Sequence, residues 1–104
     1  YADGYRRGWS NRAWMGIAGE RAPVIGRVSM DQTVVRLPPS AAREGDEVVV
    51  IGGEPGDGAP SVEDLALLIE SVPYEVLTGI GPRVPRLYRA SDSAWVVPAR
   101  LRAD

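Results

Sequence analysis

The chain of 104 residues contains no cysteine, no histidine and no phenylalanine, and arginine supplies all 12 of its basic residues, so lysine is absent as well. Without cysteine or histidine the chain cannot build a zinc finger, an iron–sulfur site, a thiol nucleophile or a Ser-His-Asp triad. Without lysine it has no side-chain amine for a Schiff base. Carboxylates are the remaining metal ligands, and their pattern predicts no metal site.

Charge and hydropathy exclude two further classes of partner. Acidic residues outnumber basic ones by 14 to 12, which gives a net charge of −2. Non-specific binding to nucleic acid or to an anionic membrane needs clustered positive charge. No stretch approaches the roughly 20 apolar residues of a membrane span. We therefore expect neither nucleic acid nor membrane as a partner, although arginines near aromatics at 6–12 and 83–89 leave a single-strand-binding barrel as an alternative.

The composition favours a turn-rich β domain. The 12 glycines and 9 prolines exceed the average combined share of roughly 12 per cent, while hydrophobic residues still make up 44% of the chain. Two apolar, β-prone segments at 13–17 and 21–28, joined by a turn at 18–20, predict a hairpin. Alternation predicts a strand at 32–37, and the valine-rich run 47–51 suits a buried strand.

One helix is predicted over 61–71. Ser61 and Asp64 resemble a capping box, and Pro73 is expected to end the helix. Residues 74–77 could add one further turn, and 83–89 is predicted as a last strand. The apolar island 95–98 in the tail either docks or frays. These elements predict a mainly β fold, a small Greek-key-type barrel with one short helix.

The glycine-rich loop 51–58 lies between a predicted strand and the helix, where phosphate-binding loops occur. A phosphate loop needs consecutive backbone N–H groups aimed at an anion, usually with a cation nearby. This loop instead carries Glu54, Asp57 and the donor-less Pro55. We interpret it as a surface connection.

Two polar segments are harder to explain by packing. Residues 1–7 place two tyrosines and two arginines around an Asp-Gly turn, and 26–32 interrupts an apolar strand with Arg27, Asp31 and Gln32. Polar groups in a strand need partners. In one interpretation Arg27 pairs with Asp31 across a sheet and Tyr1 packs at the barrel rim. In the other, Arg27 and the backbone N–H groups around Met30 bind a carboxylate or phosphate.

Five motifs, taken together, resemble the C-terminal domain of alanine racemase. They are YADGY at 1–5, RAPVIGRVSMDQ at 21–32, GDEVVVIG at 45–52, PYEVL at 73–77 and RVPR at 83–86. The resemblance extends from Tyr1 to about Tyr88. It implies that residues 1–89 form this β domain, truncated at its N-terminus, and that 90–104 is a C-terminal tail.

The family interconverts L- and D-alanine with pyridoxal 5′-phosphate, and supplies D-alanine for the cell wall. Its cofactor is held by a lysine of an N-terminal α/β barrel, and the C-terminal domain of the partner subunit closes the active site of a homodimer. The second base is a tyrosine in a Ser-Tyr-Gly segment upstream of the first residue matched here. The resemblance therefore implies no catalytic residue in this chain, which is expected to be inactive alone.

What the resemblance does carry over is the wall of the site. It implies that the Met30 N–H binds the substrate carboxylate, with Asp31 beside it at the subunit junction. Tyr74 is implied to reach the cofactor phosphate. The substrate entrance is implied to be lined by Tyr1, Tyr74, Arg7, Arg27 and Val72.

The chain departs from the family pattern in several ways. Ser29 stands where cysteine is commoner, and residues after Tyr88 match nothing in the pattern. The domain's opening strands are missing, which predicts open sheet edges. The chain begins at Tyr1 without a signal-like segment, which predicts an excised or truncated piece and, with the family, a cytoplasmic location. A racemase for serine or another small amino acid, and a non-catalytic β-barrel module for interaction or dimerisation, remain as alternatives.

Overall fold

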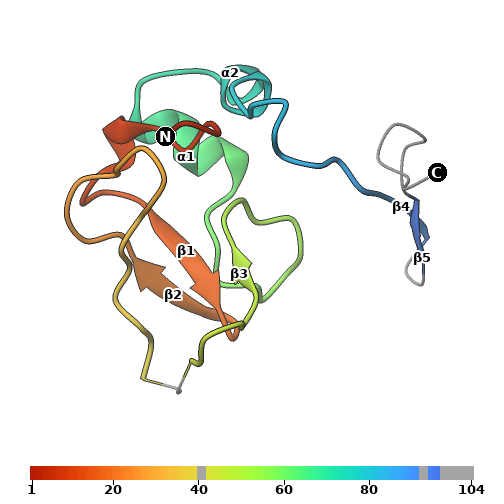
Figure 1. The fold of residues 1–104 in the computed structure, drawn as a ribbon, viewed down its shortest axis with the longest axis horizontal. Coiled ribbons are helices and arrows are strands. Elements are labelled where there is room, and N and C mark those ends of the chain that lie inside the picture. Colours follow the sequence, from red (N-terminus) through yellow and green to blue (C-terminus); the bar gives the residue numbers. More distant parts are fainter. Residues whose placement is uncertain (40–41, 92–93, 97–104) are drawn as a thin grey trace.

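A computed structural model describes residues 1–39, 42–91 and 94–96 (Figure 1). It holds a three-stranded antiparallel sheet of order β2-β1-β3, a two-stranded sheet β4-β5, a short 3₁₀ turn η1 and two short helices. The bounds are η1 Arg7–Trp9, β1 Trp14–Ile17, β2 Glu20–Pro23, β3 Val48–Val49, α1 Val62–Leu68, α2 Pro73–Thr78, β4 Tyr88–Ser91 and β5 Ala94–Val96. Within the described ranges the larger sheet does not close, so the predicted β class is confirmed without the closed barrel.

The predicted hairpin is confirmed as β1 and β2. Ile17 pairs with Glu20 across the two-residue turn formed by Ala18 and Gly19, whose φ angles are 52° and 75°. Positive φ at both central residues defines the turn type that matches strand twist in tight hairpins. The second strand ends at Pro23, however, and not at Val28.

The strand predicted at 32–37 is wrong, because only Val35 pairs there, in an isolated bridge with Val24. On one side of the bridge, Pro23 has no N–H to donate. On the other side, Gly26 turns away with a φ of 79° and gives its N–H to the Asn11 Oδ1 at 2.7 Å. The ladder therefore cannot extend in either direction.

The strand predicted at 47–51 is reduced to β3, which pairs with β1. Val48 is 43% exposed and Val50 37%, so the prediction that this run is buried is also wrong. Within the described residues β3 is an edge strand, and no strand pairs with its other side.

The capping box predicted at the start of α1 is confirmed. The Asp64 N–H donates to Ser61 Oγ at 3.0 Å, and the Ser61 N–H donates to Asp64 Oδ2 at 3.1 Å, which forms a capping box. The helix ends at Leu68, earlier than predicted, because Glu70 adopts a left-handed φ of 52°. Pro73 begins α2 at its first turn, so the further turn predicted at 74–77 is a second helix.

The strand predicted at 83–89 is wrong over most of its length, since β4 begins only at Tyr88. Pro85 lacks an N–H, and the Arg86 side chain binds backbone carbonyls of the preceding turn. β4 pairs with β5, which contains the first residues of the apolar island, while 97–98 lie outside the described residues. Figure 1 shows this small hairpin apart from the main body.

The core lies between the larger sheet, η1 and the two helices. Trp9 is 1% exposed, and its indole N–H donates to the Leu65 carbonyl oxygen at 2.8 Å. Val28 and Val76 are equally buried beside them. This bond ties η1 to α1, and α1 packs against α2. None of the helices in the described ranges is long and apolar enough to cross a membrane.

The carboxylate of Asp57 organises the loop 51–58. It accepts the N–H groups of Gly53 and Glu54 at 3.1 Å each, and that of Ala59 at 2.9 Å. The donors that a phosphate would need are therefore taken by the loop's own side chain. These bonds, that from Ala59 foremost and then that from Glu54, lower the pKa of Asp57 against a smaller opposing effect of desolvation.

Replacing Asp57 tests this arrangement. A carboxylate whose pKa is lowered in the folded state stabilises the fold above its unfolded pKa of about 3.9, and this contribution disappears as pH falls through the folded pKa. We expect Asp57→Ala to lower the Tm of the 104-residue chain at neutral pH, and the difference to shrink below about pH 4. Circular dichroism melts across this range measure it. The control is Glu44→Ala, an exposed carboxylate. A difference that is the same at neutral and acidic pH contradicts the prediction.

Candidate functional site

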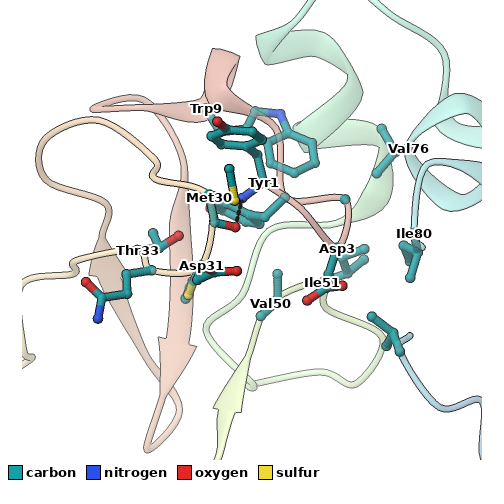
Figure 2. A pocket seen from close by; sticks show the side chains of 15 residues that line it. Tyr1, Asp3, Trp9, Met30, Asp31, Thr33, Val50, Ile51, Val76 and Ile80 are labelled. Atoms are coloured by element: carbon teal, nitrogen blue, oxygen red, sulfur yellow. Dashed lines mark hydrogen bonds between the residues drawn. The ribbon is translucent and has the colours of Figure 1, made fainter. Parts of the chain in front are cut away.

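A cavity of about 330 Å³ lies between the N-terminal turn, the loop after β2 and the segment around α2 (Figure 2). Its wall is mostly apolar. Figure 2 shows Met30 and Asp31 on one side of the cavity, and Val76 and Ile80 on the other. Three residues predicted for the site, Tyr1, Met30 and Asp31, thus line the same cavity, although Tyr1 is far from the other two in sequence.

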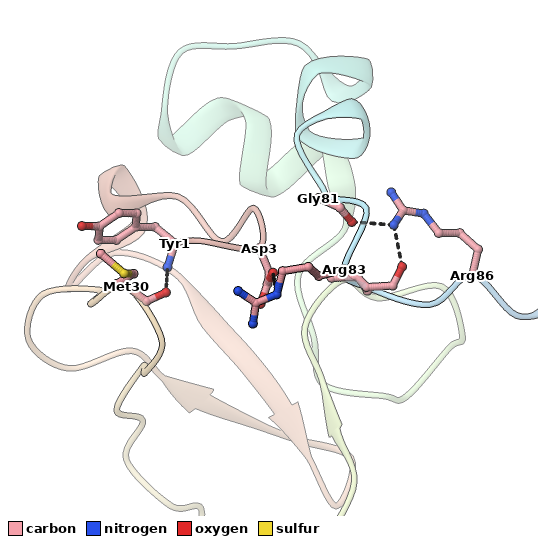
Figure 3. A network of polar contacts seen from close by, with 7 residues as sticks. Tyr1, Asp3, Met30, Gly81, Arg83 and Arg86 are labelled. Carbon is pink, nitrogen blue, oxygen red and sulfur yellow. Dashed lines mark hydrogen bonds and ion pairs between the residues drawn. The ribbon is translucent and has the colours of Figure 1, made fainter. Parts of the chain in front are cut away.

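Backbone hydrogen bonds join the first residues to the Met30 loop. The Ala2 N–H donates to the Met30 carbonyl oxygen at 2.9 Å. The N-terminal ammonium of this chain, on Tyr1, donates to the carbonyl oxygens of Ser29 at 2.7 Å and of Met30 at 2.8 Å (Figure 3). The position of Met30 is therefore set by the N-terminal turn, and not only by its own loop.

These bonds leave the Met30 N–H available. Every peptide bond in the structure is trans, so the N–H of Met30 points opposite to the carbonyl of Ser29. Because that carbonyl faces Tyr1, the N–H faces away from Tyr1, and no acceptor among the described residues receives it. A backbone donor without a partner beside a cavity can bind an anionic group.

Arg7 and Val72 lie together on a second, more polar hollow beside α2. The Arg7 guanidinium also sits 5.5 Å from the centre of the Tyr1 ring, in a cation–π contact. Arg7 thus lies between the two hollows. In the same region, Arg6 Nη2 donates to the Glu75 carbonyl oxygen at 3.2 Å.

Tyr74 and Arg27 are not brought into either hollow. Tyr74 stands in the first turn of α2 with 67% of its surface exposed, and Arg27 is exposed on the loop after β2. The ion pair between Arg27 and Asp31, one of the two interpretations of the sequence, does not form in the part of the chain that the structure describes. The side chains of Tyr74 and Arg27 are therefore exposed to solvent and line neither hollow.

Two residues at the cavity were not assigned a role from the sequence. The Tyr5 hydroxyl is buried without a hydrogen-bond partner, and burial raises the pKa of Tyr5 to about 12, so the phenol stays neutral. Asp3 Oδ1 lies 3.3 Å from Arg83 Nε (Figure 3). The only signal in the sequence was their place in the polar segment 1–7. Among the described residues, no three acidic side chains gather as a metal site.

Comparison with known protein families and sequences finds similarity to alanine racemases. The profile of "Alanine racemase, C-terminal domain" matches residues 1–88. The alanine racemase of Symbiobacterium thermophilum is 51% identical over 89 residues, which are 85% of this chain and 23% of the relative. Alanine racemase 2 of Bacillus subtilis is 42% identical over 89 residues, which are 85% of this chain and 22% of the relative.

Solved structures agree. The alanine racemase of the D-cycloserine producer Streptomyces lavendulae superposes with a TM-score of 0.77 and 42% identity, covering 88% of this chain and 24% of that one. The Bartonella henselae enzyme, with covalently bound pyridoxal phosphate, gives a TM-score of 0.74 and 32% identity, covering 86% and 25%.

The chain spans about a quarter of the length of these relatives. The profile matches residues 1–88, and the relative from Symbiobacterium thermophilum and the Streptomyces lavendulae structure cover 85% and 88% of this chain. The chain therefore belongs to the family of alanine racemase C-terminal domains.

Proposed function

We propose that residues 1–88 serve as the C-terminal domain of a pyridoxal-phosphate-dependent alanine racemase. The domain closes the active site of the partner subunit in a homodimer, and the whole cytoplasmic enzyme interconverts L- and D-alanine, which supplies D-alanine for the cell wall. The observation that carries this proposal is the Met30 N–H, which has no acceptor among the described residues and belongs to a loop that lines the cavity, in a chain whose relatives are alanine racemases.

The Met30 N–H binds the substrate carboxylate in this proposal. A hydrogen bond from a backbone N–H to a carboxylate is charge-assisted and is stronger than a neutral one. The Met30 carbonyl accepts the Ala2 N–H, which keeps the loop in place while the Met30 N–H is used. Asp31 lies beside it on the cavity wall, at the proposed subunit junction.

The cofactor fits this chain as a group that it touches and not as one that it holds alone. The chain has no lysine, so the covalent link comes from elsewhere in the enzyme. The exposed Tyr74 hydroxyl makes no hydrogen bond among the described residues, and is free to donate to the cofactor phosphate. Bound pyridoxal phosphate supplies the electron sink that stabilises a carbanion at the substrate's α-carbon.

The remaining residues form the entrance. Arg7 lies against the Tyr1 ring, with Val72 on the same side, and Arg27 extends from the loop that carries Met30. Guanidinium groups attract the carboxylate of an amino acid, and aromatic rings limit the size of what passes. In this proposal neither catalytic base is in the chain, so the domain is inactive until it is joined to the rest of the enzyme.

A chimera tests the function. Residues 1–88 replace the matching region of the Symbiobacterium thermophilum alanine racemase, which is 51% identical. We expect this chimera to form D-alanine from L-alanine with a kcat/KM within about a hundredfold of the parent, because small misplacements at a subunit junction cost up to this factor. D-alanine is measured with a coupled D-amino acid oxidase assay.

The chimera also separates the alternatives. Faster racemisation of serine than of alanine would favour a racemase for another small amino acid. A chimera that is folded and dimeric, binds pyridoxal phosphate and yet racemises nothing would overturn the proposed function and favour an interaction module. The parent enzyme, handled identically, is the control.

The role of Tyr74 has its own test in the chimera. Tyr74→Phe removes one hydroxyl from an exposed ring, so the fold should not change. Losing a hydrogen bond to a charged group costs about 1.5–3 kcal/mol, which predicts an apparent Kd for pyridoxal phosphate that rises by about tenfold or more. Tyr88→Phe, also on an exposed tyrosine, is the matched control. Equal cofactor affinity in both variants would remove Tyr74 from the site.

A further inference from the structure

Arg86 donates three side-chain hydrogen bonds to backbone carbonyls, and neither the motifs nor the proposed function gives it a role. The side chain is half-buried. Its Nη1 donates to the carbonyl oxygens of Gly81 and Val84 at 2.6 Å each (Figure 3). Its Nη2 donates to the carbonyl oxygen of Ile80 at 2.8 Å. One guanidinium thus gathers three carbonyls of the turn that follows α2.

This arrangement suits the side chain of arginine. A planar guanidinium presents five N–H donors in a fixed arrangement, and can therefore serve several acceptors that point in different directions. Among the described residues no carboxylate pairs with Arg86, so backbone carbonyls alone take up its donors. Arg83, in contrast, pairs with Asp3 and is 72% exposed.

The turn that Arg86 holds is joined directly to the N-terminal turn. The Gly81 N–H donates to the Asp3 carbonyl oxygen at 3.0 Å. Next to it, Gly4 has a φ of 114°, and a Cβ there would lie 2.6 Å from the Gly79 carbonyl oxygen. The two backbones therefore touch, and a displacement of one displaces the other.

The N-terminal turn continues to the Met30 loop. The Ala2 N–H, one residue before Asp3, donates to the Met30 carbonyl oxygen at 2.9 Å. On the other side, the held turn follows the last residue of α2, the helix that carries Tyr74. A continuous series of backbone contacts thus runs from the Met30 loop through residues 2–4 to the turn after α2. Arg86 holds that turn through its three hydrogen bonds.

We infer that Arg86 is a positioning residue: by fixing the turn 80–84, it sets the separation between the Met30 loop and α2, and so between the proposed contacts with substrate carboxylate and cofactor phosphate. This role rests on the proposed function. Arg86 itself touches neither group. Its effect on the site passes through Gly81 and Asp3.

The first test uses the 104-residue chain and does not depend on catalysis. Hydrogen exchange of backbone amides is followed by NMR in the unsubstituted chain, in Arg86→Gln and in Arg83→Gln. We expect the amides of Gly81 and Ala2 to exchange at least about tenfold faster in Arg86→Gln, because the bonds that hold the turn are lost. Arg83→Gln, a matched loss of a positive charge from the same turn, should change them little, since exposed ion pairs contribute little. Unchanged exchange at both amides in Arg86→Gln would overturn the inference.

The second test uses the racemase chimera below its melting temperature, with rates divided by the concentration of cofactor-loaded sites. We expect Arg86→Gln to raise both the KM for alanine and the apparent Kd for pyridoxal phosphate by about tenfold, because a misplaced contact weakens binding at a distance. Arg86→Lys keeps the charge but not the planar guanidinium. Its KM and Kd should lie between those of the unsubstituted chimera and those of Arg86→Gln. If Arg86→Gln lowers only the Tm and leaves KM and Kd unchanged, the residue is merely structural and the inference is wrong. An inactive unsubstituted chimera would instead count against the proposed function, a separate outcome.

Discussion

The buried indole of Trp9 is the contact on which the arrangement of this domain depends. In a chain without phenylalanine it is the largest fully buried side chain among the residues that the structure describes, and its N–H reaches the Leu65 carbonyl across 56 residues of sequence. An indole N–H left unpaired in a core would be costly, so this bond selects how η1 meets α1. Because α1 in turn packs against α2, the helix that carries Tyr74 is placed indirectly by Trp9.

The candidate site has no single element of its own. It is assembled where the N-terminal turn meets the loop after β2 on one side and the end of α2 on the other, and most of the joining contacts are backbone hydrogen bonds. Such contacts do not depend on which side chains are present. Sequences that differ at about half of their positions or more, as relatives with identities of 38–51% do, can therefore keep the same backbone arrangement.

Local chemistry could be predicted from the sequence, and long-range geometry could not. The capping box of Ser61 and Asp64 and the turn at Ala18 and Gly19 depend on neighbouring residues, so both were predictable. The closed barrel and the strand at 83–89 depend on which partners are available. Nothing near Arg86 in sequence shows that its donors meet three carbonyls, and Tyr5 gave no sign that its hydroxyl would be buried. Tyr1, Met30 and Asp31 were expected through family resemblance, and the structure places them on one cavity without testing their roles.

The edge of β3 has a consequence for how the domain behaves on its own. Val48 in β3 and Val50 just after it are exposed, and the outer side of β3 is unpaired among the described residues. Open apolar edges are templates for pairing with another chain. Asp46 and Glu47, just before the strand, supply the charge that repels such pairing. Salt screens the repulsion between exposed charges. Raising the ionic strength therefore favours edge-to-edge self-association of the separated domain.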